Sequence, residues 1–251
     1  MKMKTLKGAE VSAKIKEQVT QMMEGLEGPA PKLAIVRVGE KPDDMSYERG
    51  AVKKMENFGL RVRTYVFPEQ ISDSDFKAEF SAINRDPDVS GILLLRPLPK
   101  QIAETDIEKM IDPEKDLDGI SPANIARVFA GDKTGFAPCT AEAVIEVLKA
   151  NEIDMTGKNV TIVGRSMVVG RPLSMLMLKE NATVTICHTR TRDLETECRR
   201  AENGKICGDV DFQSIESMAS MATPVPGGVG AVTTAVLAKH LVLAGQRQRR
   251  N

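Results

Sequence analysis

The sequence predicts an α/β protein made of two parallel-sheet domains, and two observations lead to that prediction. Short apolar runs bounded by turn residues alternate with longer amphipathic stretches, which is the order of strands and helices in a parallel sheet with right-handed crossovers. The same order begins again after Pro138-Cys139-Thr140, and a chain of 251 residues can hold two such cores.

In the first half, three apolar runs are expected to form strands of one sheet. Ser72 is placed to cap a following helix, because its hydroxyl can accept a hydrogen bond from the first turn. The predicted strands are 32–39, 61–67 and 91–95, and the predicted helices, from apolar residues at helical spacing, are 43–58 and 72–84.

In the second half, Thr140 is expected to cap a helix that runs through Val144, Val147 and Leu148. The later elements are a strand at 159–163, a helix at 171–180, a strand at 182–187 and a last helix at 233–243.

Composition excludes several classes of protein. Lys plus Arg and Asp plus Glu each number 35, so no net field attracts nucleic acid or an acidic membrane. No apolar run is long enough to span a bilayer. Two histidines cannot form a multi-His metal site, and the four cysteines include no C-x-x-C pair. We therefore expect a cytoplasmic protein without metal, nucleic-acid partner or membrane association.

The stretch Thr223-Pro224-Val225-Pro226-Gly227-Gly228-Val229-Gly230 is the most informative one in the chain. Its prolines fix φ and remove backbone donors, while the paired glycines allow the main chain to approach a ligand closely. Such a segment suits a rigid wall against a flat ring system. A surface turn is the alternative interpretation.

A second motif, Val163-Gly164-Arg165-Ser166, ends a predicted strand, and Gly170 opens the next helix. This arrangement aims backbone N–H groups and a helix N-terminus at an anion, as dinucleotide sites require. The spacing differs from the usual G-x-G-x-x-G, so a generic strand-to-helix turn is the alternative.

The residues after the following strand, His188-Thr189-Arg190-Thr191, stand where a Rossmann-like domain reads the ribose 2′ position. Arg165, Thr189 and Arg190 favour the 2′-phosphate of NADP, because a cation and hydroxyls suit a phosphate. Solvated surface arginines are the alternative.

A third motif, Lys115-Asp116-Leu117-Asp118-Gly119, holds two carboxylates. They could cap a turn or hold a metal ion. The motif supplies too few ligands for a calcium loop, so no metal site is predicted here.

Together these three motifs resemble the methylenetetrahydrofolate dehydrogenase/cyclohydrolase family of one-carbon metabolism. The resemblance covers nearly the whole chain, and its motifs stand in the family's order. It implies a folate domain at 1–139 plus 225–251, to which the last helix returns, and a Rossmann-like NADP domain at 140–224. It also implies a homodimer.

The resemblance assigns roles to individual residues. Tyr47 would stack on the folate, and the Asp118 carboxylate would accept hydrogen bonds from the donor edge of the pterin. The other residues implied to bind substrate are Leu95, Pro97, Leu98, Pro226, Gly227 and Gly228; those implied to bind cofactor are Gly164, Arg165, Ser166, Gly170, Thr189 and Arg190.

The chain departs from the family at two polar positions. The family's Tyr-x-x-x-Lys motif supplies the lysine of cyclohydrolase chemistry, but four residues after Tyr47 stands Ala51. Leu95 replaces the glutamine that commonly bonds this lysine, and Lys54 is a weak catalytic substitute one turn further along. We expect that dehydrogenase chemistry is retained and that cyclohydrolase activity is weak or absent.

A further departure lies at Ala201-Glu202, where about two strands, on the order of thirty residues, are missing relative to the family. Either the polypeptide is shortened there or the written sequence omits a stretch. We favour omission, because loss of two strands would uncover apolar edges.

Two other functions stay open. One is another two-domain NAD(P)-dependent oxidoreductase, which leaves the Pro-Gly-Gly wall and the Asp118 loop unassigned. The other is a non-catalytic folate-binding protein, which the shortened cofactor domain favours; saturable NADP binding would separate it from an enzyme.

Overall fold

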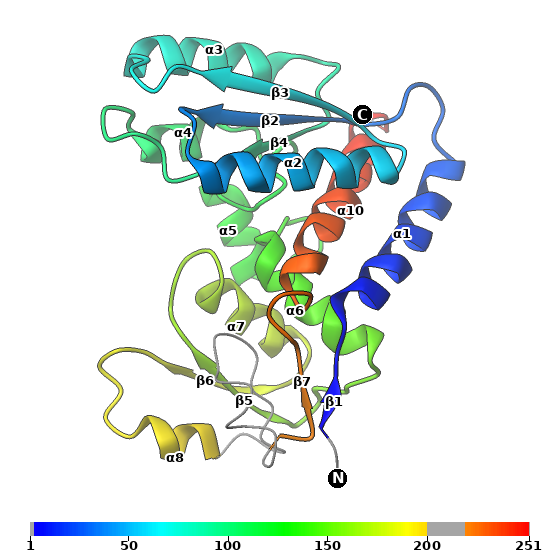
Figure 1. Ribbon diagram of the computed structural model, residues 1–251, viewed down its shortest axis with the longest axis vertical. Helices are drawn as coiled ribbons and strands as arrows, with labels where there is room; N and C mark the ends of the chain where they lie inside the picture. Colours follow the sequence, from blue (N-terminus) through cyan, green and yellow to red (C-terminus); the bar gives the residue numbers. More distant parts are fainter. Residues whose placement is uncertain (1–2, 200–218, 251) are drawn as a thin grey trace. The chain divides into compact units, whose positions relative to one another are not determined.

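The computed structural model describes residues 3–199 and 219–250, which form two compact units (Figure 1). Unit 1 contains Met1–Lys14, Val128–Lys133 and Pro138–Thr233; unit 2 contains Ile15–Arg127, Thr134–Ala137 and Thr234–Asn251. Both units hold parallel strands, so the predicted α/β class is confirmed. The predicted domain limits stay a prediction.

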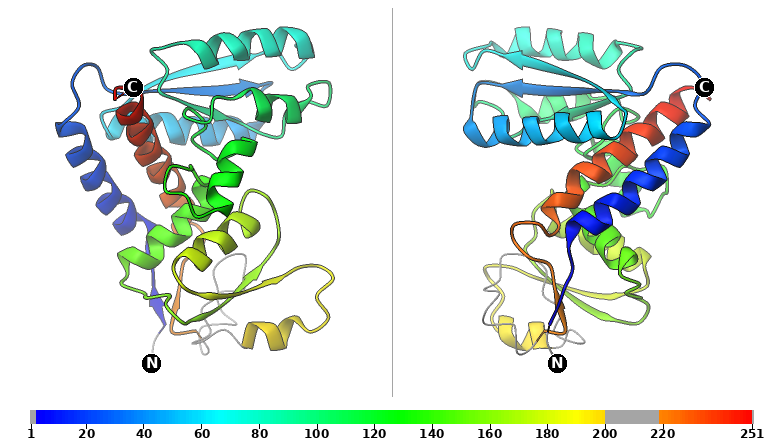
Figure 2. Two further views of the ribbon diagram at one scale, coloured as in Figure 1. Left: turned by 180° about the vertical axis from the view of Figure 1, so that it is seen from behind. Right: turned by 45° about the vertical axis from the view of Figure 1, so that its right-hand side comes forward.

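Unit 2 is built on a parallel sheet with strand order β3-β2-β4. Its strands are β2 (Lys32–Val38), β3 (Arg61–Phe67) and β4 (Gly91–Leu94), within one residue of the predicted ends. In both figures α2 (Pro42–Asn57) and α3 (Asp73–Arg85) lie on opposite faces of this sheet (Figures 1 and 2). Apolar residues of β2, β4, α3 and α4 (Glu104–Met110) form one buried cluster.

The start of α3 in unit 2 follows its sequence signal. The Ser72 hydroxyl accepts a hydrogen bond from the Asp75 N–H at 3.1 Å, which confirms the predicted cap of α3. Further helices are α1 (Gly8–Glu24), α5 (Pro122–Phe129) and α10 (Gly230–Gln248). Helix α10 is longer at both ends than predicted, and it lies beside α1, where Gln246 Nε2 donates to Met22 O at 3.0 Å (Figure 2). The predicted return of the last helix to the first domain is thus confirmed.

Unit 1 contains a parallel pair, β5 (Asn159–Val163) and β6 (Thr183–Cys187), joined by α7 (Gly170–Lys179). Helix α6 (Cys139–Ala150) precedes the pair and α8 (Leu194–Arg199) follows it. Residues Ala201-Glu202, where the shortening was predicted, lie outside the described residues.

The cap predicted for α6 is wrong. Pro138, not Thr140, is the N-cap, because the Pro138 carbonyl accepts the first helical hydrogen bond from the Glu142 N–H at 3.1 Å. Thr140 lies inside the first turn. No side chain caps this helix.

The N-terminal strand β1 (Lys4–Thr5) holds the Pro-Gly-Gly segment in place through β7 (Met221–Ala222). The pairing continues to the start of α1, where the Gly8 N–H donates to Gly227 O at 2.8 Å. A Cβ on Gly8 would lie 2.1 Å from Gly228 O, so only glycine permits this approach.

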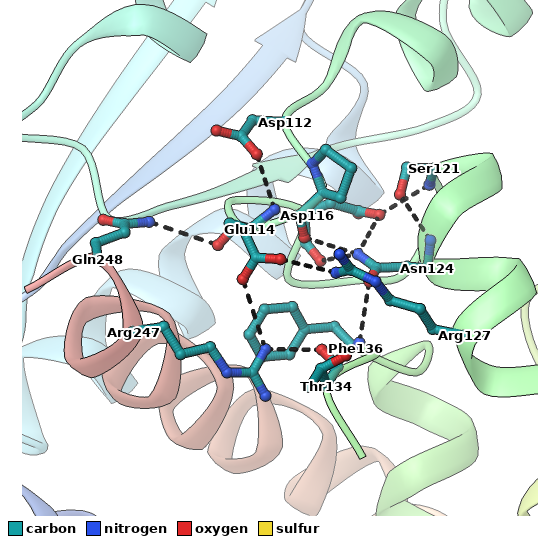
Figure 3. Close-up of polar contacts among 11 residues, drawn as sticks. Asp112, Glu114, Asp116, Ser121, Asn124, Arg127, Thr134, Phe136, Arg247 and Gln248 are labelled. Carbon is teal, nitrogen blue, oxygen red and sulfur yellow. Dashed lines mark hydrogen bonds and ion pairs between the residues drawn. The ribbon is translucent and has the colours of Figure 1, made fainter. Parts of the chain in front are cut away.

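The loop that contains Asp118 is fixed by its neighbour Asp116, which is 1% exposed. The Asp116 carboxylate accepts hydrogen bonds from Ile120 N at 3.0 Å, Ser121 N at 2.8 Å and Asn124 Nδ2 at 3.0 Å (Figure 3). The sequence left open whether the carboxylates of this motif cap a turn or hold a metal ion. These hydrogen bonds show that Asp116 caps the turn into α5.

Replacing Gly8 with alanine is expected to lower the free energy of unfolding by about 2 kcal/mol, because the new methyl group overlaps a main-chain oxygen. Urea unfolding measures this change. Gly50→Ala on exposed α2, where the added Cβ meets nothing within 4 Å, is the control and should stabilise the helix slightly. Equal effects of the two changes would contradict the close approach.

Replacing Asp116 with alanine is expected to cost about 3 kcal/mol, because buried donors lose their acceptor. Asp112→Ala removes an acceptor of the Glu114 N–H in the same loop and should cost about 1 kcal/mol. Denaturant unfolding of both variants measures the two losses in the free energy of unfolding. A loss for Asp116→Ala that is no larger than the loss for Asp112→Ala would contradict the prediction.

Candidate active site

The predicted substrate residues of unit 2 begin on α2. Tyr47 is 38% exposed on this helix, so its ring is accessible for stacking. Ala51, one helical turn further on, is fully buried, and Leu95 directly after β4 is also buried. The two positions where the family has polar groups are therefore apolar and closed to solvent.

Lys54 lies where α2 meets α1. Its Nζ is 5.7 Å from the centroid of the Phe58 ring, and Lys16 Nζ lies 6.0 Å from the same centroid. Burial lowers the pKa of Lys54, and the nearby Lys16 ammonium lowers it further. A catalytic role for Lys54 stays a prediction.

The loop after β4, which carries Pro97 and Leu98, is held by α4. The Leu98 N–H donates to Glu104 Oε2 at 2.9 Å, and Arg96 pairs with Glu104 at 3.2 Å and with Glu108 at 2.9 Å. Lys41 Nζ also donates to Pro97 O at 2.8 Å. Sequence reasoning missed Glu104, since nothing in its local pattern links it to this loop.

Asp118 is half-buried and follows the fully buried Leu117 in the capped loop. Lys115 at the start of the motif donates from Nζ to the carbonyls of Asn84 and Asp86, at 2.8 and 2.7 Å. Lys115 and Asp116 are thus committed to holding the loop. Asp118 is the second carboxylate of the motif, and its predicted role in binding the folate stays a prediction.

In unit 1, the Pro-Gly-Gly segment has the glycine geometry that its sequence predicts. Gly227 has a φ of +95°, and a Cβ on Gly228 would lie 2.3 Å from Pro224 O. Val225, Pro226 and Gly227 are exposed. Gly228 therefore approaches the main chain of its own segment, at Pro224. The exposed residues 225–227 can form a wall against a ligand.

The predicted cofactor loop is a strand–turn–helix segment from β5 into α7. Gly164 has a φ of +127°, and a Cβ on Gly170 would lie 2.1 Å from Gly164 O. The Ser166 hydroxyl accepts from Val169 N at 3.0 Å, which tightens the turn, and Arg165 is exposed beside it. Both glycines are therefore required by the turn itself.

The second predicted cofactor segment lies at the same edge of the strand pair. Gly164 N donates to Cys187 O at 2.8 Å, so both loops start where β5 and β6 end. The Thr191 hydroxyl accepts from His188 N at 2.8 Å and turns the chain, leaving Thr189 and Arg190 exposed. Ligands of open α/β sheets bind at this carboxyl edge.

Within residues 3–199 and 219–250, no group of three or more His, Cys, Asp or Glu residues could hold a metal ion. In the same ranges no helix is long and apolar enough to cross a membrane.

Comparison with known proteins agrees with this geometry. The chain is 42% identical to the bifunctional protein FolD of Alkaliphilus metalliredigens and 43% identical to that of Clostridioides difficile, over 97% of this chain and 98% and 96% of theirs. The crystal structure of the bifunctional FolD methylenetetrahydrofolate dehydrogenase/cyclohydrolase of Campylobacter jejuni matches with a TM-score of 0.91 at 35% identity, covering 98% of this chain and 99% of that one.

These matches also bear on the shortening. The first FolD alignment is 277 positions long against a chain of 251 residues, so at least 26 of its positions have no residue here. The model of the family's NAD(P)-binding domain matches in two pieces, 138–203 and 199–249, which meet where the gap was predicted.

The model of the family's catalytic domain matches residues 6–118, which include Tyr47, Leu95 and Asp118. With the NAD(P)-binding domain after it, most of the chain is assigned. This chain therefore belongs to the tetrahydrofolate dehydrogenase/cyclohydrolase family.

Proposed function

We propose that this chain oxidises 5,10-methylenetetrahydrofolate to 5,10-methenyltetrahydrofolate with NADP⁺, as a step of one-carbon metabolism. The observation that supports this most is the pair of loops, 164–170 and 188–191, at the carboxyl edge of β5 and β6. Family membership supports the same reaction.

The reaction breaks one C–H bond of the methylene bridge and transfers its hydrogen with both electrons to the nicotinamide. The folate becomes the methenyl cation, which its two flanking nitrogens stabilise, so no protein acid or base is required. The protein contributes positioning. Tyr47 stacks on the folate and Asp118 accepts hydrogen bonds from the amino edge of its pterin. The segment Pro226–Gly228 offers a rigid wall to a flat ring.

We propose NADP over NAD because cationic and hydroxyl side chains lie in the loops expected to bind the ribose and its 2′-phosphate. Arg165, Thr189 and Arg190 are exposed around the two loops, with no acidic residue among them. We place the protein in the cytoplasm as a homodimer with a reduced folate as its substrate.

The second family reaction, addition of water to the methenyl carbon, is proposed to be weak or absent. Hydrolysis requires a polar group that orients water and moves protons. The buried Ala51 and Leu95 can shape a pocket but cannot perform either task.

The dehydrogenase is tested by NADPH formation from 5,10-methylenetetrahydrofolate with the full-length protein. Arg190→Gln is expected to raise KM for NADP⁺ roughly tenfold and leave KM for NAD⁺ unchanged, because only NADP carries the 2′-phosphate. Arg192→Gln, two residues further on, is the control. Folate binding without saturable NADP binding would support the non-catalytic folate-binding function instead.

The intact mass of the same preparation decides whether the gap at Ala201-Glu202 is real. We expect a mass several kilodaltons above the 27.4 kDa of this sequence, since the cofactor domain of the relatives is longer. A mass of 27.4 kDa would show a true deletion and predict weak NADP binding.

Ala51→Lys combined with Leu95→Gln is expected to raise hydrolysis of 5,10-methenyltetrahydrofolate at least roughly tenfold, because the pair restores a proton-transfer group and its partner. Loss of the methenyl absorbance measures the rate. Ala51→Met with Leu95→Met adds similar volume without polarity and should have no effect. An unmodified protein that hydrolyses as fast as it dehydrogenates would refute the proposal.

A further inference from the structure

A buried histidine on the last helix contacts the loop that carries Asp118. His240 is 2% exposed on α10, and its Nδ1 lies 2.8 Å from the main-chain oxygen of Leu117, across 123 residues of sequence. A carbonyl oxygen only accepts hydrogen bonds, so the imidazole must carry its proton on Nδ1. The bond therefore ends on the residue directly before Asp118.

Leu117 is held from two sides by this arrangement. Its side chain packs on β4, where a Cβ on Gly91 would lie 2.3 Å from Leu117 Cδ1. Its carbonyl is held by His240. A residue fixed through both its side chain and its carbonyl leaves the next residue little freedom, which sets the direction of the Asp118 backbone.

The imidazole itself is fixed by an aromatic neighbour. The ring centroids of His240 and Phe136 are 5.0 Å apart. Arg247 of the same helix has its Cζ 4.6 Å from the Phe136 centroid and donates to Thr134 O (Figure 3). The Phe136 N–H donates to Asn124 Oδ1 at 3.3 Å, and Asn124 Nδ2 reaches Asp116. The histidine thus belongs to the same packed group as the cap of the loop.

We propose that His240 is a positioning residue for folate recognition, which acts through the Leu117 carbonyl on Asp118. The Asp118 carboxylate can accept hydrogen bonds from an amino-pyrimidine edge only if its position is fixed relative to the bound ring. Asp116 fixes the C-terminal side of the loop, and His240 fixes its middle. The inference rests on the proposed function for the role of Asp118, but it concerns binding of the folate and not turnover.

The test measures, by calorimetry, the binding of 5-formyltetrahydrofolate, a stable reduced folate, to the full-length protein. His240→Leu, which keeps the volume but removes the donor, is expected to raise the Kd roughly tenfold and leave the Kd of NADP within about twofold. His240→Asn keeps a short side-chain donor and should recover most of the affinity. If the leucine variant does not fold, His240→Gln, which displaces the donor by one bond, replaces it.

A general loss of stability is separated from positioning by a matched control. Gln246→Leu removes another donor to a main-chain carbonyl, that of Met22, from the same helix. It should lower the unfolding midpoint without changing the Kd of the folate. Asp118→Asn combined with His240→Leu should then weaken binding less than the sum of the two single changes, because both act on one contact.

The outcomes distinguish the two proposals. Folate binding that is unchanged in His240→Leu, or that adds independently to Asp118→Asn, overturns the role of His240. Folate binding without oxidation overturns the dehydrogenase while leaving this inference in place. A protein that binds no folate overturns both.

Discussion

The arrangement of unit 2 depends on one buried carboxylate. Asp116 accepts three hydrogen bonds at the point where β4, the Asp118 loop and α5 meet, and the Lys115 carbonyl accepts from Ile92 N at 2.7 Å. A buried charge is tolerated only where its donors are complete. This requirement fixes the loop on the sheet, and through Asn124 and Phe136 it fixes where α10 can pack.

The sheet of unit 2 could be predicted from sequence because its signals are local. A strand buried on both faces is a continuous apolar run, and Ser72 caps a helix through its own first turn. The pairing of β1 with β7 could not be predicted, since each strand has two residues and the partners are more than 200 positions apart. The Pro138 cap was missed because its carbonyl, and no side chain, begins the helix.

The residues of the site stay predictions, but part of the geometry around them could be predicted from the sequence. The motifs predict Tyr47 and Asp118 as site residues, and they point correctly to glycines that the two turns require through close main-chain approaches. They do not identify the groups that hold these residues. His240 bonds Leu117 only because the fold brings together segments 123 residues apart. Glu104 lies near Leu98 in sequence, but no local pattern marks its bond to the Leu98 N–H.

The part of the proposed cofactor site that the structure describes lies before the gap predicted at Ala201-Glu202. The turn at Gly164 and the loop at Thr189, which we propose to bind the phosphate and ribose, have the glycine and hydroxyl geometry of such loops. The gap relative to the family falls after α8, where the two matched pieces of the NAD(P)-binding domain meet. Val163 is 62% and Ile186 38% exposed on the described strand pair, and we expect the omitted stretch to cover apolar side chains of this kind. Under the proposed function, phosphate binding depends on the two described loops, whereas oxidation of bound folate also depends on how the nicotinamide is placed.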